Sequence, residues 1–245
     1  MTSAWINPAG GLRYHARALL GARLWAPFRH ALNAWLSSRE LGTERVLLVG
    51  PSAAHCISDA FLSRFSEVSA LEPDPVAGFL LLRRLRRLGV PARVERTDQL
   101  LRPLLDGTSG LAESLRSDPK LAVVFCNVLG QTRFLVEDEE HARFKAAFRA
   151  RIMPLLEQRA WLSFHDRLSG ALAPQFSQPF AAPARLTDAE VLREVYRAEH
   201  ALASAELLDH GSDDFFPTER PHTYFSWQID RERCHLIEAV ASTEP

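Results

Sequence analysis

VLLVGPSAAHC, residues 46–56, and VSALEPDP, residues 68–75, are the two stretches that decide the fold. Each begins with a short run of apolar or small residues; the first run ends at Gly50 and Pro51, and the second ends at Glu72. Such runs are typical of strands that are buried on both faces, as in a parallel sheet covered by helices. The two stretches therefore predict two buried strands of an α/β protein.

Outward from these stretches, strand-like and helix-like segments alternate along the chain. Strand–helix alternation gives right-handed crossovers and a parallel sheet. The last two strands are joined by the short polar connection 230–233, which predicts an antiparallel hairpin. We expect an α/β fold with a seven-stranded, mostly parallel sheet and an antiparallel C-terminal hairpin. The expected strands are 46–49, 68–71, 92–95, 121–126, 161–164, 223–229 and 235–240, and the expected helices are about 55–65, 76–88 and 137–156.

The residues before the first strand have a helical pattern of their own. Apolar and small side chains recur at helical spacing over about 12–36, with a break expected at Pro27. We expect an N-terminal helical cap over 1–43, followed by one domain over 44–245.

Two later segments interrupt the alternation. Three prolines in 170–185 exclude one continuous helix or one central strand there. An ordered loop is expected instead, either a lid over a ligand or a packed connection. Thr187 is a good N-cap residue and predicts a last helix that ends near Leu208.

Composition and charge exclude several classes of protein. The chain has 245 residues, of which 47% are hydrophobic and 24% charged, as in a globular protein that buries one large core. The net charge of -1 gives no general attraction to nucleic acid or to an anionic membrane, so neither is an expected partner. No apolar run approaches the roughly 18 residues of a membrane span, and the first residues do not read as a secretion signal. A cytoplasmic location is expected, and the oligomeric state is left open.

The cysteines favour a reducing compartment. Cys56, Cys126 and Cys234 are odd in number, widely spaced and not arranged in metal-ligand pairs. His222 and His235 could face each other across the C-terminal hairpin, but two histidines without a third ligand do not make a zinc site. We therefore expect neither disulfides nor a bound metal.

The residues that follow the predicted strands are candidates for a binding site. In an open parallel sheet, ligands bind at the carboxyl ends of the strands, where the strand order reverses. Small residues after the first strand let a ligand approach the backbone and the following helix. Glu72 lies 22 positions after Gly50, where a carboxylate accepts the two hydroxyl groups of a ribose. The candidates are Gly50, Pro51, Ser52 and Ala53, then Glu72 and Pro73, then Asp98, and finally Asn127, Val128 and Leu129.

With this order of residues the chain resembles the class I S-adenosylmethionine-dependent methyltransferases, a Rossmann-like family with seven strands and an antiparallel final hairpin. The resemblance covers about 44–240. It implies that Gly50, Ser52 and Ala53 border the methionine and ribose part of S-adenosylmethionine, that Glu72 binds the ribose hydroxyls, and that Asp98 binds the adenine amine. Asn127, Val128 and Leu129 would then flank the sulfonium. The implied function is methyl transfer to a small-molecule or side-chain acceptor.

The chain departs from the family in the loop after the first strand. That loop usually carries two or three glycines, whereas here Gly50 is followed by Pro51, Ala53 and Ala54. Alanine disfavours a positive φ, and each methyl group crowds a ligand that approaches the backbone. An alternative is therefore a non-catalytic scaffold or partner protein with the methyltransferase fold and a degenerate cofactor loop. A nicotinamide-dependent oxidoreductase fits less well, because G-x-G-x-x-G is missing.

His165 and Asp166 are the candidate catalytic residues. Methyl transfer is an in-line displacement, so the protein mainly orients the reactants and removes a proton from the acceptor where necessary. His165 follows the fifth strand, at the ligand edge of the sheet, and histidine titrates near neutral pH. The alternative is structural: Asp166 caps a turn and His165 packs in the core.

Overall fold

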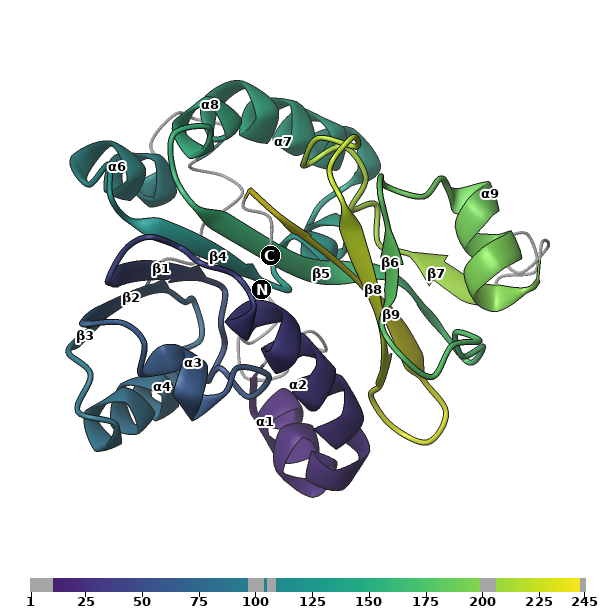
Figure 1. The fold of residues 1–245 in the computed structure, drawn as a ribbon, viewed down its shortest axis with the longest axis horizontal. Helices are drawn as coiled ribbons and strands as arrows, with labels where there is room; N and C mark the ends of the chain where they lie inside the picture. The colour runs from purple at the N-terminus through teal and green to yellow at the C-terminus, as the bar shows by residue number, and fades with distance from the viewer. Residues whose placement is uncertain (1–10, 97–103, 105–108, 199–205, 243–245) are drawn as a thin grey trace.

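The computed structural model describes residues 11–96, 104, 109–198 and 206–242. In this part of the chain nine strands form one sheet, in the order β3-β2-β1-β4-β5-β9-β8-β6, with β7 paired to β5 (Figure 1). Strands β1 to β5 run parallel, and β9 enters antiparallel to β5. The strands are β1 Arg45–Val49, β2 Glu67–Leu71, β3 Ala92–Glu95, β4 Ala122–Cys126, β5 Trp161–Gly170, β6 Phe180–Ala182, β7 Leu207–Asp209, β8 His222–Gln228 and β9 Cys234–Ala241.

The expected fold class is confirmed, with two strands more than the seven expected. Strand β6 lies in the segment expected to be a loop and pairs with β8, while β7 pairs with the far end of β5. The strand order reverses between β1 and β4, which puts the expected ligand position at their carboxyl ends.

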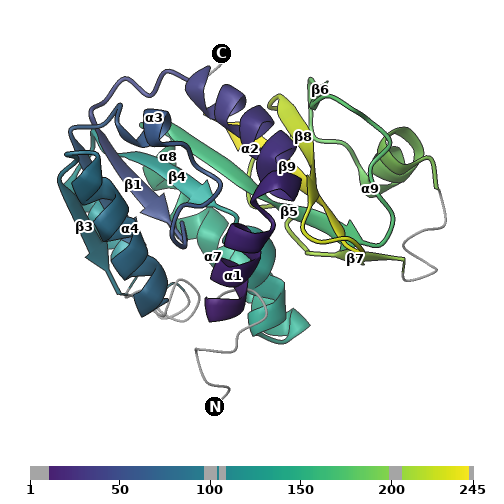
Figure 2. The same ribbon diagram turned by 90° about the horizontal axis from the view of Figure 1, so that it is seen from below.

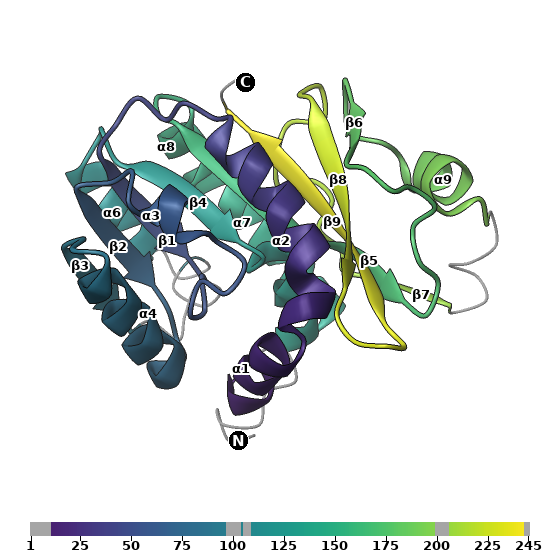
Figure 3. The same cartoon turned by 60° about the horizontal axis from the view of Figure 1, so that its bottom comes forward.

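Helices cover both faces of the sheet (Figures 1 and 3). One apolar core lies between the sheet and α2, α3 and α4, and a second lies between the sheet and α6, α7 and α8. A 3₁₀ helix, Leu129–Leu135, follows β4. The α-helices are α1 Gly11–Leu20, α2 Ala22–Ser37, α3 Asp59–Leu62, α4 Pro75–Arg87, α6 Gly110–Ser117, α7 Asp138–Arg151, α8 Met153–Leu156 and α9 Asp188–Glu190. None of the helices in the described residues is long and apolar enough to cross a membrane.

The N-terminal helix breaks at Gly21 and not at Pro27 as expected. Pro27 lies inside α2, which continues to Ser37. At Gly21 a side chain would lie 2.7 Å from the carbonyl oxygen of Arg17 and 3.2 Å from the indole nitrogen of Trp25. Only glycine fits this close approach, so the chain changes direction there. Helix α2 then packs on the sheet, with the ring of Phe28 stacked on that of Trp227 at 4.7 Å.

Two expected helices are shorter in the structure. The segment 55–65 forms only the one-turn helix α3, which Ser58 caps by accepting a hydrogen bond from the amide of Phe61. The helix expected over 187–208 begins at Thr187 with a capping box but ends at Tyr196. The next residue, Arg197, is left-handed at φ 54°, and the chain later forms β7.

Strand β5 was expected to stop at His165 and Asp166, and this was wrong. Both residues are buried in the middle of a ten-residue strand. The strand extends because β9 pairs with it along its whole length. The pairing skips one residue between Asp166 and Leu168, which makes Arg167 a β-bulge.

A buried network of charged side chains lies on the face of the sheet to which Arg167 points, the face of Glu238. Glu238, 1% exposed, accepts hydrogen bonds from Arg167 at 3.1 Å and from Arg185 at 3.0 Å. The ring nitrogen Nδ1 of His222 lies 2.7 Å from the same carboxylate. Arg167 also donates to Asp188 at 2.8 Å. The network joins β5, β8 and β9 to the segment that precedes α9.

Candidate functional site

The loop after β1 has left-handed backbone at three alternate positions. φ is 63° at Gly50, 52° at Ser52 and 55° at Ala54. Left-handed φ is the conformation that glycine adopts without strain and that a Cβ atom disfavours. The loop therefore keeps a glycine-type backbone although two of the three positions carry other residues. The sequence candidates Pro51 and Ala53, which lie between these positions, are buried.

Glu72 joins the loops that follow β1 and β2. Its Oε2 accepts a hydrogen bond from the amide of Ser52 at 2.6 Å, and its Oε1 accepts one from the amide of Asp74 at 2.9 Å. The residue is 4% exposed, and burial raises the pKa of its carboxyl group to about 7. Each carboxylate oxygen still has a second lone pair. Glu72 can therefore accept two further hydrogen bonds at this edge. Its neighbour Pro73 is exposed.

Asn127 ends β4 in a left-handed conformation, with φ 59°. Its side chain is tied to β5, because Oδ1 accepts from the amide of Asp166 at 2.6 Å and Nδ2 donates to the carboxylate of Asp166 at 2.9 Å. Val128 packs directly against Gly50, where an added Cβ would lie 2.6 Å from the Cβ of Val128. Leu129 lies in the second core. Of these three candidates, Asn127 and Val128 thus lie at the carboxyl ends of the strands, whereas Leu129 packs in the core beneath them.

Helix α1 lies over the loops that follow β1 and β2 (Figure 2). His15 contacts His55 with Nδ1 and Nε2 2.9 Å apart, and its other ring nitrogen lies 3.5 Å from the carboxylate of Asp74. The hydroxyl of Tyr14 lies 3.9 Å from Sγ of Cys56. Burial raises the pKa of Tyr14 well above its ordinary value, and the carboxylates of Glu72 and Asp166 raise it further. Helix α1 thus contacts the loops after β1 and β2 through Tyr14 and His15.

His165 and Asp166 point to opposite faces of β5, as adjacent strand residues do. His165 contacts the hydroxyl of Ser163 at 2.9 Å, and its ring lies against that of Phe216. Burial lowers the pKa of His165 to about 4. Asp166 faces the β4 end with Asn127. The structure therefore does not bring the two candidate catalytic residues together, and only Asp166 lies with the other candidates.

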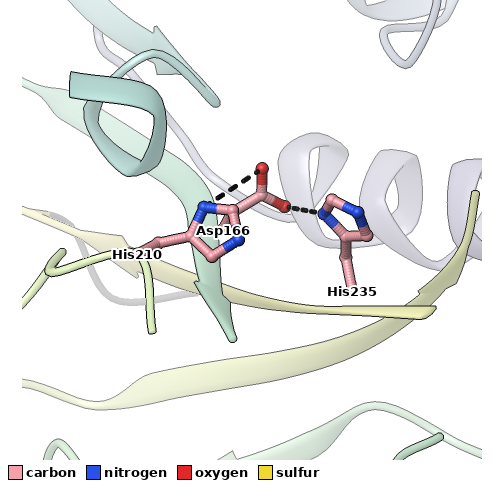
Figure 4. A group of neighbouring side chains, drawn as sticks. All are labelled: Asp166, His210 and His235. Atoms are coloured by element: carbon pink, nitrogen blue, oxygen red, sulfur yellow. Dashed lines mark hydrogen bonds and ion pairs between the residues drawn. The ribbon is translucent and has the colours of Figure 1, made fainter. Parts of the chain in front are cut away.

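Two histidines flank the carboxylate of Asp166 (Figure 4). Nδ1 of His235 lies 2.7 Å from Oδ1, and Nδ1 of His210 lies 3.9 Å from Oδ2. Gln131 also donates to Oδ2. Burial by itself would raise the pKa of Asp166, but His235 and His210 outweigh it and the pKa falls to about 2. The carboxylate is therefore ionised and surrounded by donors.

Asp166, His210 and His235 also have the residue types and spacing of a metal site, with ligand atoms within 4.8 Å of one another. Both ring nitrogens of His210 are engaged, since Nδ1 lies 2.8 Å from the carbonyl oxygen of Gly130 and Nε2 lies 2.8 Å from the hydroxyl of Ser169. A ligand nitrogen needs a free lone pair. Within the described part of the chain, this trio offers a metal only two free ligands.

Neither histidine of this group was a candidate from the sequence. His210 and His235 come from segments far from Asp166 along the chain, and only the pairing of β5 with β9 and β7 brings them near it. His222 and His235 do not face each other, because the register pairs His222 with Val240 and His235 with Trp227. Asp98 lies outside the described residues.

Comparison with known proteins gives fold likeness only. No family model matches this chain. No curated protein matches it either. Among solved structures it is similar to a magnesium protoporphyrin IX methyltransferase from Synechocystis PCC 6803, with 14% identity, 91% of this chain and 83% of that chain covered, and a TM-score of 0.42.

Two further similar structures are an N-methyltransferase from Bradyrhizobium japonicum WM9 and an S-adenosylmethionine-dependent methyltransferase from Clostridium acetobutylicum. The first has 13% identity, 95% and 98% coverage of this chain and that chain, and a TM-score of 0.39. The second has 7% identity, 89% and 73% coverage, and a TM-score of 0.37. All three TM-scores lie below 0.5, so function has to be argued from the site of this chain.

The left-handed loop leads to a prediction about stability. Ser52→Gly is expected to raise the free energy of unfolding by roughly 1 kcal/mol, because glycine relieves the strain of positive φ and Ser52 buries no apolar side chain. Ala53→Gly is the matched control. Ala53 is buried without positive φ, so its replacement should lower stability by roughly 1 kcal/mol. Urea denaturation measures both, and equal effects of the two variants would contradict the strain argument.

Proposed function

We propose that the chain binds S-adenosylmethionine at the carboxyl ends of β1, β2 and β4 and transfers its methyl group to an acceptor. The observation that carries the proposal is the alternation of left-handed residues Gly50, Ser52 and Ala54 beside the carboxylate of Glu72. This pair of features lies where the strand order reverses, the usual ligand position of an open parallel sheet.

The donor and acceptor groups of this edge suit the cofactor. Glu72 has a free lone pair on each oxygen for the two ribose hydroxyls. The loop from Gly50 to Ala54 would hold the methionine part, and Asn127 and Val128 would lie near the sulfonium. Asp98 remains the predicted partner of the adenine amine. When bound, the cofactor supplies a methyl group that its positive sulfur activates for displacement.

The remaining work of catalysis falls to groups of this chain. Asn127 holds the ends of β4 and β5 together through two hydrogen bonds to Asp166, which keeps the edge rigid. Helix α1 covers the edge with Tyr14 and His15 and would exclude water from the bound reactants. Orientation and exclusion of water are the main contributions that methyl transfer requires.

Calorimetric titration with S-adenosylmethionine and S-adenosylhomocysteine tests this proposal, with a nicotinamide cofactor as the negative control. At a pH well above the pKa of about 7, where Glu72 is ionised, Glu72→Gln is expected to weaken binding by about 1 to 3 kcal/mol, since an amide replaces the charged acceptor of the ribose hydroxyls. Glu67→Gln is the matched control, because Glu67 is exposed at the other end of the same strand. Equal affinities of the wild type and Glu72→Gln would remove Glu72 from the site.

One observation favours a second function, that of a non-catalytic scaffold. Ser52 and Ala54 place Cβ atoms on backbone where glycine is the unstrained choice, and these atoms narrow the approach to the loop. In that case a folded wild-type protein binds neither cofactor at millimolar concentration. A double variant, Ser52→Gly with Ala54→Gly, separates the two functions further. If this variant binds the cofactor and the wild type does not, the side chains of Ser52 and Ala54 prevent binding in the wild type.

A further inference from the structure

We propose that His235 takes the proton of the methyl acceptor and that Asp166 positions it for this step. The inference rests on the proposed methyl transfer and names the class of acceptor: a molecule with a hydroxyl or thiol group that loses its proton as the methyl group is added. His165, the histidine expected from the sequence to have this role, faces the opposite side of β5.

The hydrogen-bond donors around Asp166 fix the tautomer of His235. The carboxylate accepts from the side chains of Asn127 and Gln131 on Oδ2, and Nδ1 of His235 lies 2.7 Å from Oδ1. An ionised carboxylate can only accept, so Nδ1 must carry the hydrogen. When the ring carries one hydrogen, the lone pair therefore lies on Nε2, and this is the form of histidine that accepts a proton.

Among the described residues, Nε2 of His235 has no hydrogen-bond partner. The two histidines beside Asp166 differ in this respect, because both nitrogens of His210 are occupied. They also differ in access: the side chain of His235 is 13% exposed, whereas that of His210 is 3% exposed. The indole of Trp227, 5.9 Å from the imidazole between ring centres, forms one wall beside His235. His235 is thus the histidine that a ligand can reach.

The position of His235 links it to the proposed methyl-transfer edge. Asp166 bonds to Asn127 at the end of β4 through one oxygen and to His235 through the other. In the proposed step, the acceptor oxygen or sulfur forms a bond to the methyl carbon while the bond from that carbon to the cofactor sulfur breaks. The electron pair of the broken bond stays on the cofactor sulfur, which becomes a neutral thioether. The acceptor proton moves to Nε2 of His235 and later to water.

Two measurements on the full-length protein test His235 without knowledge of the acceptor. The first is nitrogen-15 NMR of the histidine rings at neutral pH, where we expect Nδ1 of His235 to be protonated and Nε2 to be free. The second is modification with diethyl pyrocarbonate, which labels unprotonated ring nitrogens, followed by peptide mass spectrometry. We expect label on His235 and on the exposed His30, and none on the buried His165 and His210.

Variants assign these signals to the proposed pair. In Asp166→Asn the amide no longer enforces one tautomer, so the Nδ1-protonated signal of His235 is expected to split and its labelling to fall, while His30 is labelled as before. His210→Gln should leave both readouts of His235 unchanged. If Asp166 and the two histidines were instead joint ligands of a metal ion, zinc would shift the NMR signal of His235 in the wild type, and both variants would reduce this shift to the same extent. That result would overturn the proposal. A wild-type ring of His235 that is protonated on Nε2, or that takes no label, would overturn the proposal even if neither variant folds.

The same reagent separates this inference from the proposed function. If S-adenosylhomocysteine binds, it should slow the labelling of His235 but not that of His30, and binding without protection would place His235 away from the methyl group and overturn the inference. Failure of the cofactor to bind would instead overturn the proposed function. It would also remove the methyl-acceptor role of His235, while the NMR signal would still report its tautomer.

Discussion

Glu238→Gln is expected to lower the free energy of unfolding by about 3 to 5 kcal/mol, the largest effect among the variants considered for this chain. Glu238 and Arg167 are each 1% exposed, and Arg185 and His222 reach the same carboxylate. Glutamine keeps the shape of the side chain but removes the negative charge that faces the buried guanidinium group of Arg167 and the partly buried one of Arg185. The penalty therefore comes mainly from the buried Arg167, whose remaining carboxylate partner among the described residues, Asp188, is itself exposed.

Guanidinium denaturation measures this effect, with Glu232→Gln as the control. Glu232 is exposed in the connection between β8 and β9, so its replacement should change stability by less than about 0.5 kcal/mol. Burial by itself would raise the pKa of Glu238, but His222, Arg167 and Arg185 outweigh it and hold the pKa below its ordinary range.

The depressed pKa of Glu238 also predicts the pH dependence of its contribution. Its stabilisation is fully present above the unfolded-state pKa of about 4.3 and is lost as the pH falls toward the folded-state value. The difference between wild type and Glu238→Gln should therefore be constant at neutral pH and should shrink in acid. If the difference in the free energy of unfolding stays constant down to about pH 3, the ionised carboxylate of Glu238 is not the source of the stabilisation.

Gly50→Ala is expected to lower the free energy of unfolding by about 2 to 5 kcal/mol. The left-handed φ of 63° costs an alanine about 1 to 2 kcal/mol. The new methyl group would also lie 2.6 Å from the Cβ of Val128, and overpacking of this kind costs about 1 to 3 kcal/mol. Because Val128 follows Asn127, the clash should also disturb the carboxyl end of β4.

Gly42 offers a matched control for the two parts of this cost. Its φ is 61°, but an added Cβ would meet no atom within 4 Å. Gly42→Ala should therefore cost only the conformational part, about 1 to 2 kcal/mol. Thermal and urea denaturation of both variants give the difference, which measures the packing of Val128 on Gly50. If the two variants are equally destabilised, Val128 moves aside freely and the contact does not constrain the loop.

The central strands could be predicted from the sequence because their side chains are apolar on both faces. Val46 to Val49 and Ala122 to Cys126 are buried at nearly every position, and no polar residue interrupts the pattern. Strand β5 could not be predicted in full. It continues beyond Phe164 because the polar groups of Asp166 and Arg167 are satisfied by side chains from β8, β9 and distant loops. His165 is satisfied within the strand, by the hydroxyl of Ser163.

The candidate site divides in the same way. Glu72 and Asn127 could be located from sequence, since each directly follows a parallel strand whose end is marked by a change from apolar to polar residues. His235 could not, because its place beside Asp166 depends on the register of an antiparallel pair that forms across 69 residues of chain. The positive φ of Ser52 and Ala54 also gave no signal, since neither residue type favours it.

Because of the bulge at Arg167, β5 has one residue more than the stretch of β9 that pairs with it. Asp166 pairs with Ile237 and Leu168 with Leu236, so Leu168 takes the face opposite Asp166 and Ser169 takes the face of Asp166, as if Arg167 were absent. The strand thereby presents Arg167 to Glu238 while every other side chain stays on its own face. The inserted residue thus adds a charge to the sheet without changing the register of β5 and β9 on either side of it. Removal of Arg167 would therefore take one charge from one face of the sheet and leave the pairing of β5 with β9 beside Asp166 and His235 unchanged on the opposite face.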